Sequence, residues 1–249
     1  MDGSLRTLFT LAAGAAPITL NGNDWPALSL FSVDLNGAAV RAQTLERKPG
    51  MAIGRQPAFS AARVQVSAKP VKYQNAAAEF SVSASDAKFD FAKDSDGHVV
   101  LALSAASDGQ LDASIGKRDL ESLLMAVAKP LAAAKGVGID RIEIMLSSSG
   151  PRSLAIEARI AVRKMLSAVI RVSGQLAIDD QLVARLSDLQ AAGEGMIGTM
   201  AVNFIQPQLR ELEHRELPLV SFSIGDVRLR DVKLQTPAGG VHVHASFGS

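Results

Sequence analysis

Apolar and polar residues alternate over unusually long stretches of this sequence, most regularly between residues 154 and 163. Since the side chains of a strand point alternately to opposite faces, this pattern predicts a strand with one buried face. A ten-residue strand spans about 33 Å, longer than the usual five or six residues, and needs an equally long partner on its apolar side. The apolar side carries Leu154, Ile156, Ala158, Ile160 and Val162, and the other side carries Glu157, Arg159 and Arg163.

The same alternation recurs along the rest of the chain. It predicts short strands before residue 111 and long strands after it, separated by turns. The short strands are expected at residues 63–67, 79–83, 88–91 and 101–103, and the long ones at residues 139–146, 154–162, 169–178, 222–234 and 241–247.

Two segments follow helical spacing instead. In the first, Asp119 is placed to cap a helix and Gly136 to end it, and the apolar residues between them fall on one side. This one-sided set is Leu120, Leu123, Leu124, Val127, Leu131 and Ala134.

The second helical segment, residues 195–215, is apolar almost all round in its first half, so we expect that half to be enclosed. Residues 208–216 are charged and expected to be exposed. The helix would be about 31 Å long, which matches the long strands. The apolar positions are Met196, Ile197, Met200, Ala201, Val202, Phe204 and Ile205.

These elements predict an α+β fold in which a long, highly curved antiparallel sheet wraps around one or two long helices. Residues 17–249 are expected to form a single elongated domain. Residues 1–16 form a separate N-terminal segment, read as an ordered first helix, as residues ahead of the domain, or as a remnant of an export signal. No stretch approaches the ~18 to 20 continuous apolar residues of a membrane-spanning helix. One proline in each helical segment, Pro130 and Pro207, leaves open a duplicated helix-plus-strand unit as an alternative to two independent helices.

The charge balance excludes some partners. The 249 residues include 26 Lys and Arg against 25 Asp and Glu, a formal net charge of +1. Binding to nucleic acid needs a basic face, so no nucleic-acid partner is expected. With no cysteine in the sequence, disulfides and thiolate chemistry are excluded.

Catalytic signatures are missing from the sequence. It has no GxSxG, no Gly-rich phosphate loop, no HExxH and no CxxC, so we expect no enzyme, no catalytic residue, no cofactor and no metal. His242 and His244 alternate on one strand face and could hold a metal with a third ligand, but a solvated strand explains them more simply. Asp179 and Asp180 lack the spacing of a calcium loop and fit a hairpin turn.

Aromatic residues make up only 4% of the chain. A long sheet with few rings must pack tightly on small side chains or leave a cleft. A cleft lined by aliphatic groups accepts acyl chains, whereas a filled core is the other interpretation, which the residues alone favour. The candidate lipid-contact residues are Leu120, Leu123, Leu124, Val127, Met196, Ile197, Met200 and Phe204.

Three segments favour the cleft over the filled core. Ile115-Gly-Lys-Arg-Asp-Leu120, Val172-Ser-Gly-Gln-Leu-Ala-Ile-Asp-Asp180 and Ile224-Gly-Asp-Val-Arg-Leu-Arg-Asp-Val-Lys-Leu234 resemble the LmeA-like bacterial phospholipid-binding family, whose members resemble single units of the tubular lipid-binding (TULIP) superfamily. The resemblance covers roughly residues 110–247, about half the chain. It implies a curved sheet around a helix, a hydrophobic groove for glycerophospholipid tails and a place in the bacterial cell envelope or periplasm. It brings no catalytic residues.

The hypothesis is therefore a non-enzymatic module that binds, and transfers, acyl lipids or phospholipids through transient contact with a membrane surface. The headgroup is expected at the solvent edge of the groove. The alternative is a structural or assembly protein of the bacterial envelope with the same fold, a filled core and no ligand.

Overall fold

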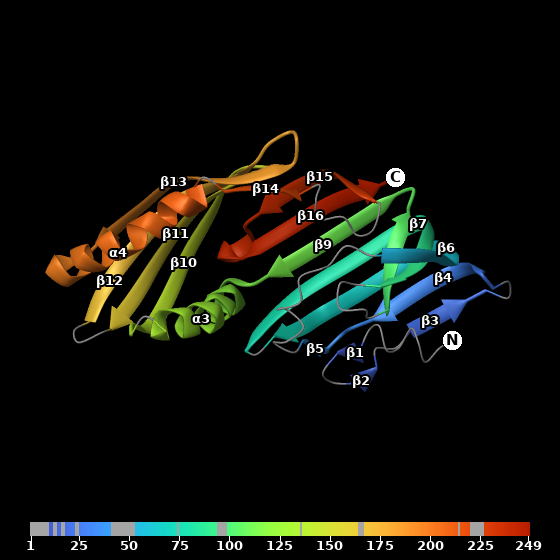
Figure 1. Ribbon diagram of the computed structural model, residues 1–249, viewed down its shortest axis with the longest axis horizontal. Helices are drawn as coiled ribbons and strands as arrows, with labels where there is room; N and C mark the ends of the chain where they lie inside the picture. The colour runs from blue at the N-terminus through green and yellow to red at the C-terminus, as the bar shows by residue number, and fades with distance from the viewer. Residues whose placement is uncertain are drawn as a thin grey trace. The chain divides into compact units, whose positions relative to one another are not determined.

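The computed structural model describes residues 10–11, 14–15, 18–22, 25–40, 53–73, 75–93, 99–134, 136–163, 167–213, 215–219 and 227–249 (Figure 1). It confirms the α+β class: two large open sheets are accompanied by a few helices. The chain divides into two compact units, and each is described by itself. Unit 1 comprises Met1–Ser114, Val220–Val232 and Val243–Ser249, and unit 2 comprises Ile115–Leu219 and Lys233–His242. The single domain expected over residues 17–249 stays a prediction.

A nine-stranded sheet belongs largely to unit 1. Its order is β15-β16-β9-β7-β6-β4-β3, with β5 also paired to β6 and β8 to β7. The strands are β3 (Ile18–Asn21), β4 (Ala27–Asp34), β5 (Ala39–Val40), β6 (Ile53–Tyr73), β7 (Ala76–Lys93), β8 (Val99–Ala105), β9 (Gly109–Ile115), β15 (Arg228–Gln235) and β16 (Val241–Gly248).

The N-terminal residues that the structure describes are strands. β1 (Thr10–Leu11) and β2 (Gly14–Ala15) pair with each other in an antiparallel hairpin. The alternative of a first helix is therefore wrong for these four positions, where Gly14 is a poor helix former. The remainder of residues 1–16 lies outside the described part of the chain.

The strands of unit 1 correct the predicted lengths. β6 has 21 residues and β7 has 18, although the sequence predicted short strands at 63–67, 79–83 and 88–91. Register shifts between β6 and β7 explain the difference, because a bulge lets a strand continue through residues that interrupt its alternation. The all-antiparallel expectation is also wrong here, since β4 and β5 both pair with β6 in parallel.

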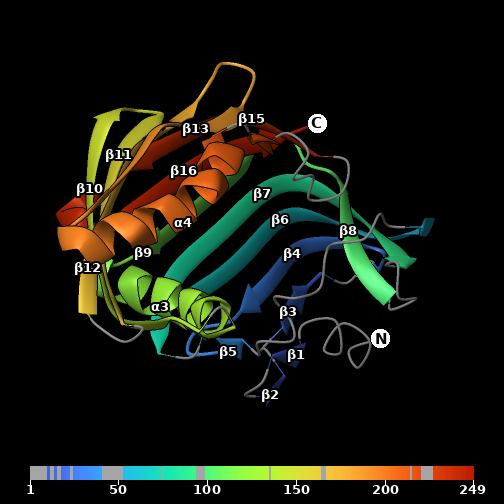
Figure 2. The same ribbon diagram turned by 60° about the vertical axis from the view of Figure 1, so that its left-hand side comes forward.

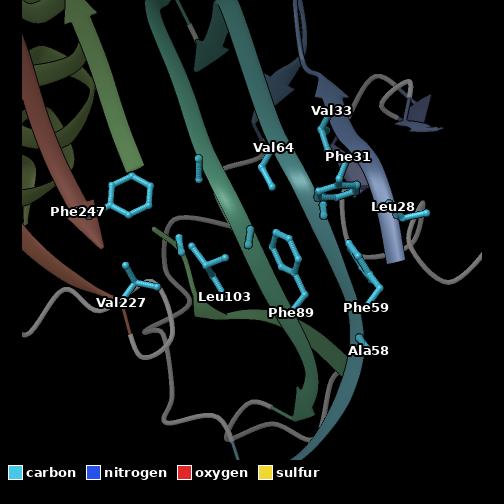
Figure 3. Close-up of a cluster of buried hydrophobic side chains, with 14 of the residues drawn as sticks. Leu28, Phe31, Val33, Ala58, Phe59, Val64, Phe89, Leu103, Val227 and Phe247 are labelled. Carbon is cyan, nitrogen blue, oxygen red and sulfur yellow. The ribbon is translucent and has the colours of Figure 1, made fainter. Parts of the chain in front are cut away.

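A cluster of stacked rings fills the core of unit 1 (Figure 3). Phe31 contacts Phe59 and Phe89 edge-on, with ring centroids 5.2 and 5.3 Å apart, and Phe59 stacks on Phe89 at 4.8 Å. These rings come from β4, β6 and β7, so they join the three strands. Each such contact adds about 0.5–1.5 kcal/mol beyond burial of the ring area. Leu28, Val33, Val64, Leu103, Val227 and Phe247 surround them.

Unit 2 holds a five-stranded antiparallel sheet in the order β10-β11-β12-β13-β14, together with two helices (Figure 2). The strands are β10 (Gly138–Gly150), β11 (Ser153–Arg163), β12 (Ser167–Ile178), β13 (Val183–Gly193) and β14 (Glu216–Pro218). The helices are α3 (Lys117–Ala133) and α4 (Gly195–Glu213), and a short 3-10 turn, η2, covers Pro237–Gly239. α3 lies along β10, and α4 packs on β13 and β12.

The long strands predicted after residue 111 are confirmed at β10, β11, β12 and β16. The segment predicted at 222–234 contains β15, but its residues 222–226 lie outside the described part. The helix start was misplaced: Gly116, not Asp119, is the N-cap, and Asp119 lies within the first turn. Gly136 does end this region, with a φ of +70° that suits glycine.

Candidate functional site

The register of unit 2 gathers its apolar side chains on one face, which we name the aliphatic face. Ala158 on β11 lies opposite Ile144 on β10 and Val172 on β12, and Ile160 likewise lies between Ile142 and Ile170. The aliphatic face is defined by Ile142, Ile144, Leu146, Leu154, Ile156, Ala158, Ile160, Val162, Ala168, Ile170, Val172, Leu176 and Leu186.

The aliphatic face is only partly covered. Ile144 on the edge strand β10 and Ile170 on the middle strand β12 are buried, whereas Ile156, Ile160 and Val172 remain half-buried. Phe204 is the sole aromatic residue in the sequence of unit 2, so the face is built from branched and small side chains. Surface of this kind gains free energy from any apolar group that covers it, at about 25 cal/mol per Å².

α3 carries four of the predicted lipid-contact residues. Leu120 and Leu123 are half-buried, and Leu124 and Val127 are 40% and 51% exposed. No residue of α3 is buried. The helix is confirmed, and a large part of its apolar side is open to solvent.

α3 also protects the open edge of the sheet. The backbone N–H of Ile144 on β10 donates a 2.9 Å hydrogen bond to the Glu121 carboxylate. An edge strand otherwise presents unpaired backbone groups to other chains. This hydrogen bond fixes the helix beside β10 and gives the N–H of Ile144 a partner.

α4 carries the other four predicted contact residues, Met196, Ile197, Met200 and Phe204, whose side chains lie outside the described part of the structure. Two other α4 residues, Gly198 and Val202, are buried, as expected for the first half of the helix. The charged second half is exposed at Arg210 and Glu211, as predicted.

Two glycines set how closely α4 approaches β13. A Cβ added to Gly193 would lie 2.0 Å from the carbonyl carbon of Gly198, which leaves no room for a side chain. At the other end of the helix, Glu213 accepts a 3.3 Å hydrogen bond from the N–H of Leu189. The helix is therefore held against the strand by backbone contact at its start and by a carboxylate at its end.

Two hollows lie on the same sheet. The first, about 430 Å³, has cationic side chains from α3, β10 and β11 in its wall, and we name it the basic hollow. The second, about 380 Å³, is lined by serine, glutamine and acidic residues of β10 to β13 together with the apolar residues Met145, Leu146, Ala155 and Ile156. The basic hollow is formed by Lys117, Arg118, Glu121, Arg141, Glu143, Met145 and Arg159.

The charges of the basic hollow do not cancel. Four cations meet two carboxylates. Arg141 pairs with Glu143 at 2.6 Å, while Glu121 lies 4.0 Å from Lys117 and already accepts the N–H of Ile144. Arg159 reaches Glu157 only at 3.9 Å. With Glu157 counted, one positive charge, that of Arg118, remains in excess in a concave wall, where an anion is favoured.

The predicted hairpin turn at Asp179 and Asp180 is confirmed between β12 and β13. The Asp179 carboxylate accepts the N–H groups of Val183 and Gln181, each at 2.9 Å, and pairs with Arg185. The pKa of Asp179 lies below its ordinary value of 3.8. The largest cause is the hydrogen bond from the N–H of Val183, and smaller contributions come from Arg185 and from the N–H of Gln181. Asp179 and Glu216 together raise the pKa of Arg185.

The histidines of β16 do not form a metal site with other described residues. Within the described ranges, no group of three or more His, Cys, Asp or Glu side chains is placed to hold a metal. The Nδ1 atom of His244 lies 2.8 Å from the Asp112 carboxylate on β9. A neighbouring strand, rather than a metal, thus accounts for the orientation of this ring.

The basic hollow was missed by sequence reasoning, which assigned no function to its cations. The signal was present in part, because the alternation placed Glu157, Arg159 and Arg163 together on one face of a strand. What the sequence does not supply is the register that sets Arg159 opposite Glu143, or the position of α3 beside β10.

Comparison with known proteins adds no relative: no family model, no curated protein and no solved structure matches this chain. The resemblance to the LmeA-like family stays a prediction. Among the helices in the described part of the chain, none is long and apolar enough to cross a membrane.

Proposed function

We propose that this protein binds acyl lipids of the glycerophospholipid type on the aliphatic face of unit 2, and carries them without chemical change. One observation carries the proposal. One face of β10, β11 and β12 is largely aliphatic, and its side chains Ile156, Ile160 and Val172 remain half-buried. Acyl chains complete such a face without directional contacts, and each CH₂ that they bury contributes about 0.8 kcal/mol.

The proposed groove has α3 and α4 as its walls, with the sheet curved around them as in the TULIP superfamily. Leu120, Leu123, Leu124 and Val127 would contact the tails from α3, and Met196, Ile197, Met200 and Phe204 from α4. Unbranched methionines suit chains of varied shape because their thioethers adapt. Exchange would follow the relative burial of the tails in protein and in membrane. The proposed location is the bacterial cell envelope or periplasm, where such lipids would be moved between membrane surfaces.

A structural or assembly role in the envelope is the second candidate. The ring cluster of unit 1 favours it, because Phe31, Phe59 and Phe89 fill that interior with the protein's own side chains. If unit 2 were completed in the same manner, it would hold no ligand.

The experiment that decides between them is mass spectrometry of lipids extracted from the purified full chain. The proposal expects acyl lipid in near-stoichiometric amount, and a protein free of acyl lipid that also takes none from vesicles would refute it. Ile160→Gln places an amide on the aliphatic face and should lower the lipid content. The matched control is Ala161→Gln, the next residue on β11, which lies on the polar face and should leave the lipid content unchanged.

A further inference from the structure

Two features meet on α3, and the proposed function uses only Leu124 and Val127 of the first. One is the exposed apolar stripe formed by Leu124, Val127 and Leu131, which are 40%, 51% and 65% exposed. The other is the basic hollow, which begins at the first turn of the same helix.

Helical geometry places these features side by side. Residues 124, 127 and 131 are spaced by three and four positions, so they form one continuous stripe along the helix. Lys117, Arg118 and Glu121 occupy the neighbouring side, which the lining of the hollow places toward the polar face of β10 and β11. A surface that meets α3 therefore meets apolar groups and cations together.

The positive charge at this end of α3 has several sources. Its N-cap, Gly116, supplies no side-chain hydrogen bond to the first turn, and the N-terminal end of a helix carries partial positive charge. Arg118 makes no ion pair within the described ranges, and its side chain lines the hollow. Arg141 and Arg159 add guanidinium groups, whose forked N–H donors match phosphate oxygens.

From this arrangement we infer that α3 is the docking element for a membrane surface containing anionic phospholipid. In the docked state the stripe of Leu124, Val127 and Leu131 enters the apolar boundary of the bilayer, and the basic hollow accepts the phosphate of a headgroup. Leu124 and Val127 would contact the tails of a bound lipid only after the protein has left the membrane. Charge complementarity selects this occupant, because an apolar partner alone would not require four cations beside the stripe. The inference rests on the proposed function in one respect: a lipid carrier must collect its cargo from a membrane.

The test is sedimentation of the full chain with phosphatidylcholine vesicles, with and without phosphatidylglycerol. Binding should require phosphatidylglycerol and should weaken at high salt. The double variant Lys117→Gln/Arg118→Gln should bind the anionic vesicles about fivefold more weakly for each charge removed. Its matched control is Arg163→Gln/Arg171→Gln, since these cations lie on the same sheet face but pair with Asp140 and Glu194 outside the hollow. The control should bind like wild type, apart from a small loss due to net charge.

A second variant tests the stripe. Leu131→Ser changes a side chain that is 65% exposed and is not among the proposed tail contacts, so the fold and the lipid content should persist and vesicle binding should fall. The inference is overturned if both α3 variants bind vesicles like wild type, or if the hollow binds inorganic phosphate while the protein ignores anionic vesicles. Lipid content, measured on the same preparations, separates the two proposals. Lipid-loaded protein with no α3-dependent vesicle binding contradicts the docking inference alone, and lipid-free protein contradicts the carrier function.

Discussion

The two units use the same alternating pattern and complete it differently. In unit 1, β4, β6 and β7 each place one phenylalanine among smaller buried side chains, and the rings of Phe31, Phe59 and Phe89 contact one another. In unit 2 the equivalent face of β10, β11 and β12 holds isoleucine, valine, leucine and alanine, and much of it is only half-buried. The apolar face of a sheet can thus be buried by the protein's own rings or left for another apolar molecule to cover.

The largest expected effect lies in unit 1. Phe31→Ala removes a ring that is 1% exposed and contacts two others, so the free energy of unfolding should fall by about 3–5 kcal/mol. Urea denaturation followed by circular dichroism measures this. A loss below that range would mean that the ring cluster does not support unit 1, and the comparison between the units would weaken.

The next largest effect on stability concerns how closely α4 packs against β13. Gly198→Ala should lower the free energy of unfolding by about 1–3 kcal/mol, because its Cβ would lie 2.7 Å from the carbonyl carbon of Gly193. Asn203→Ala, an exposed change on the same helix, is the control and should be nearly neutral. Equal stability of the two variants in urea titrations would show that the helix does not rest on β13 in this manner.

A smaller effect is expected on the aliphatic face. Ile156→Ala should cost about 1–2 kcal/mol in lipid-free protein, below the usual 2–5 kcal/mol, because this side chain is only half-buried. The cost should grow once acyl lipid is bound, since lipid that binds the folded state stabilises it and the variant binds less. Thermal unfolding with and without lipid measures the difference, and a full core-sized cost without lipid would place Ile156 in a filled interior.

The smallest effect is the pH dependence of the turn between β12 and β13. Because folding lowers the pKa of Asp179, its carboxylate contributes stability above the ordinary pKa of 3.8, and this contribution disappears as pH falls through the lowered value. Asp179→Asn should therefore lower Tm at neutral pH, and the gap to wild type should close in acid. A gap that is independent of pH from neutral to acid would show that the charge of Asp179 contributes nothing.

Strands and helices were predicted correctly from the sequence where a local pattern of apolar residues determines the element by itself. The alternation at Leu154–Val162 gave β11 and the composition of its two faces, because the period of a strand is local. The apolar spacing from Leu120 to Leu131 gave the position of α3 for the same reason.

Features that depend on distant segments were not accessible. The 21-residue β6 continues past Pro57 and Pro70 only because its bulges are accommodated by β7, and the parallel pairing of β4 with β6 depends on a crossover that no local pattern records. The basic hollow likewise joins Arg118 of α3 to Arg159 of β11, which the sequence separates by a helix and a strand.

The central claim is that acyl chains lie on the aliphatic face of unit 2. The most direct measurement is photo-crosslinking of the full chain with a phospholipid that carries a diazirine in its acyl chain, followed by peptide mass spectrometry. The account predicts adducts on Ile156, Ile160 and Val172, and on the α3 and α4 residues that flank them. Adducts confined to the polar face of the sheet, or to the Phe31 cluster of unit 1, would contradict it.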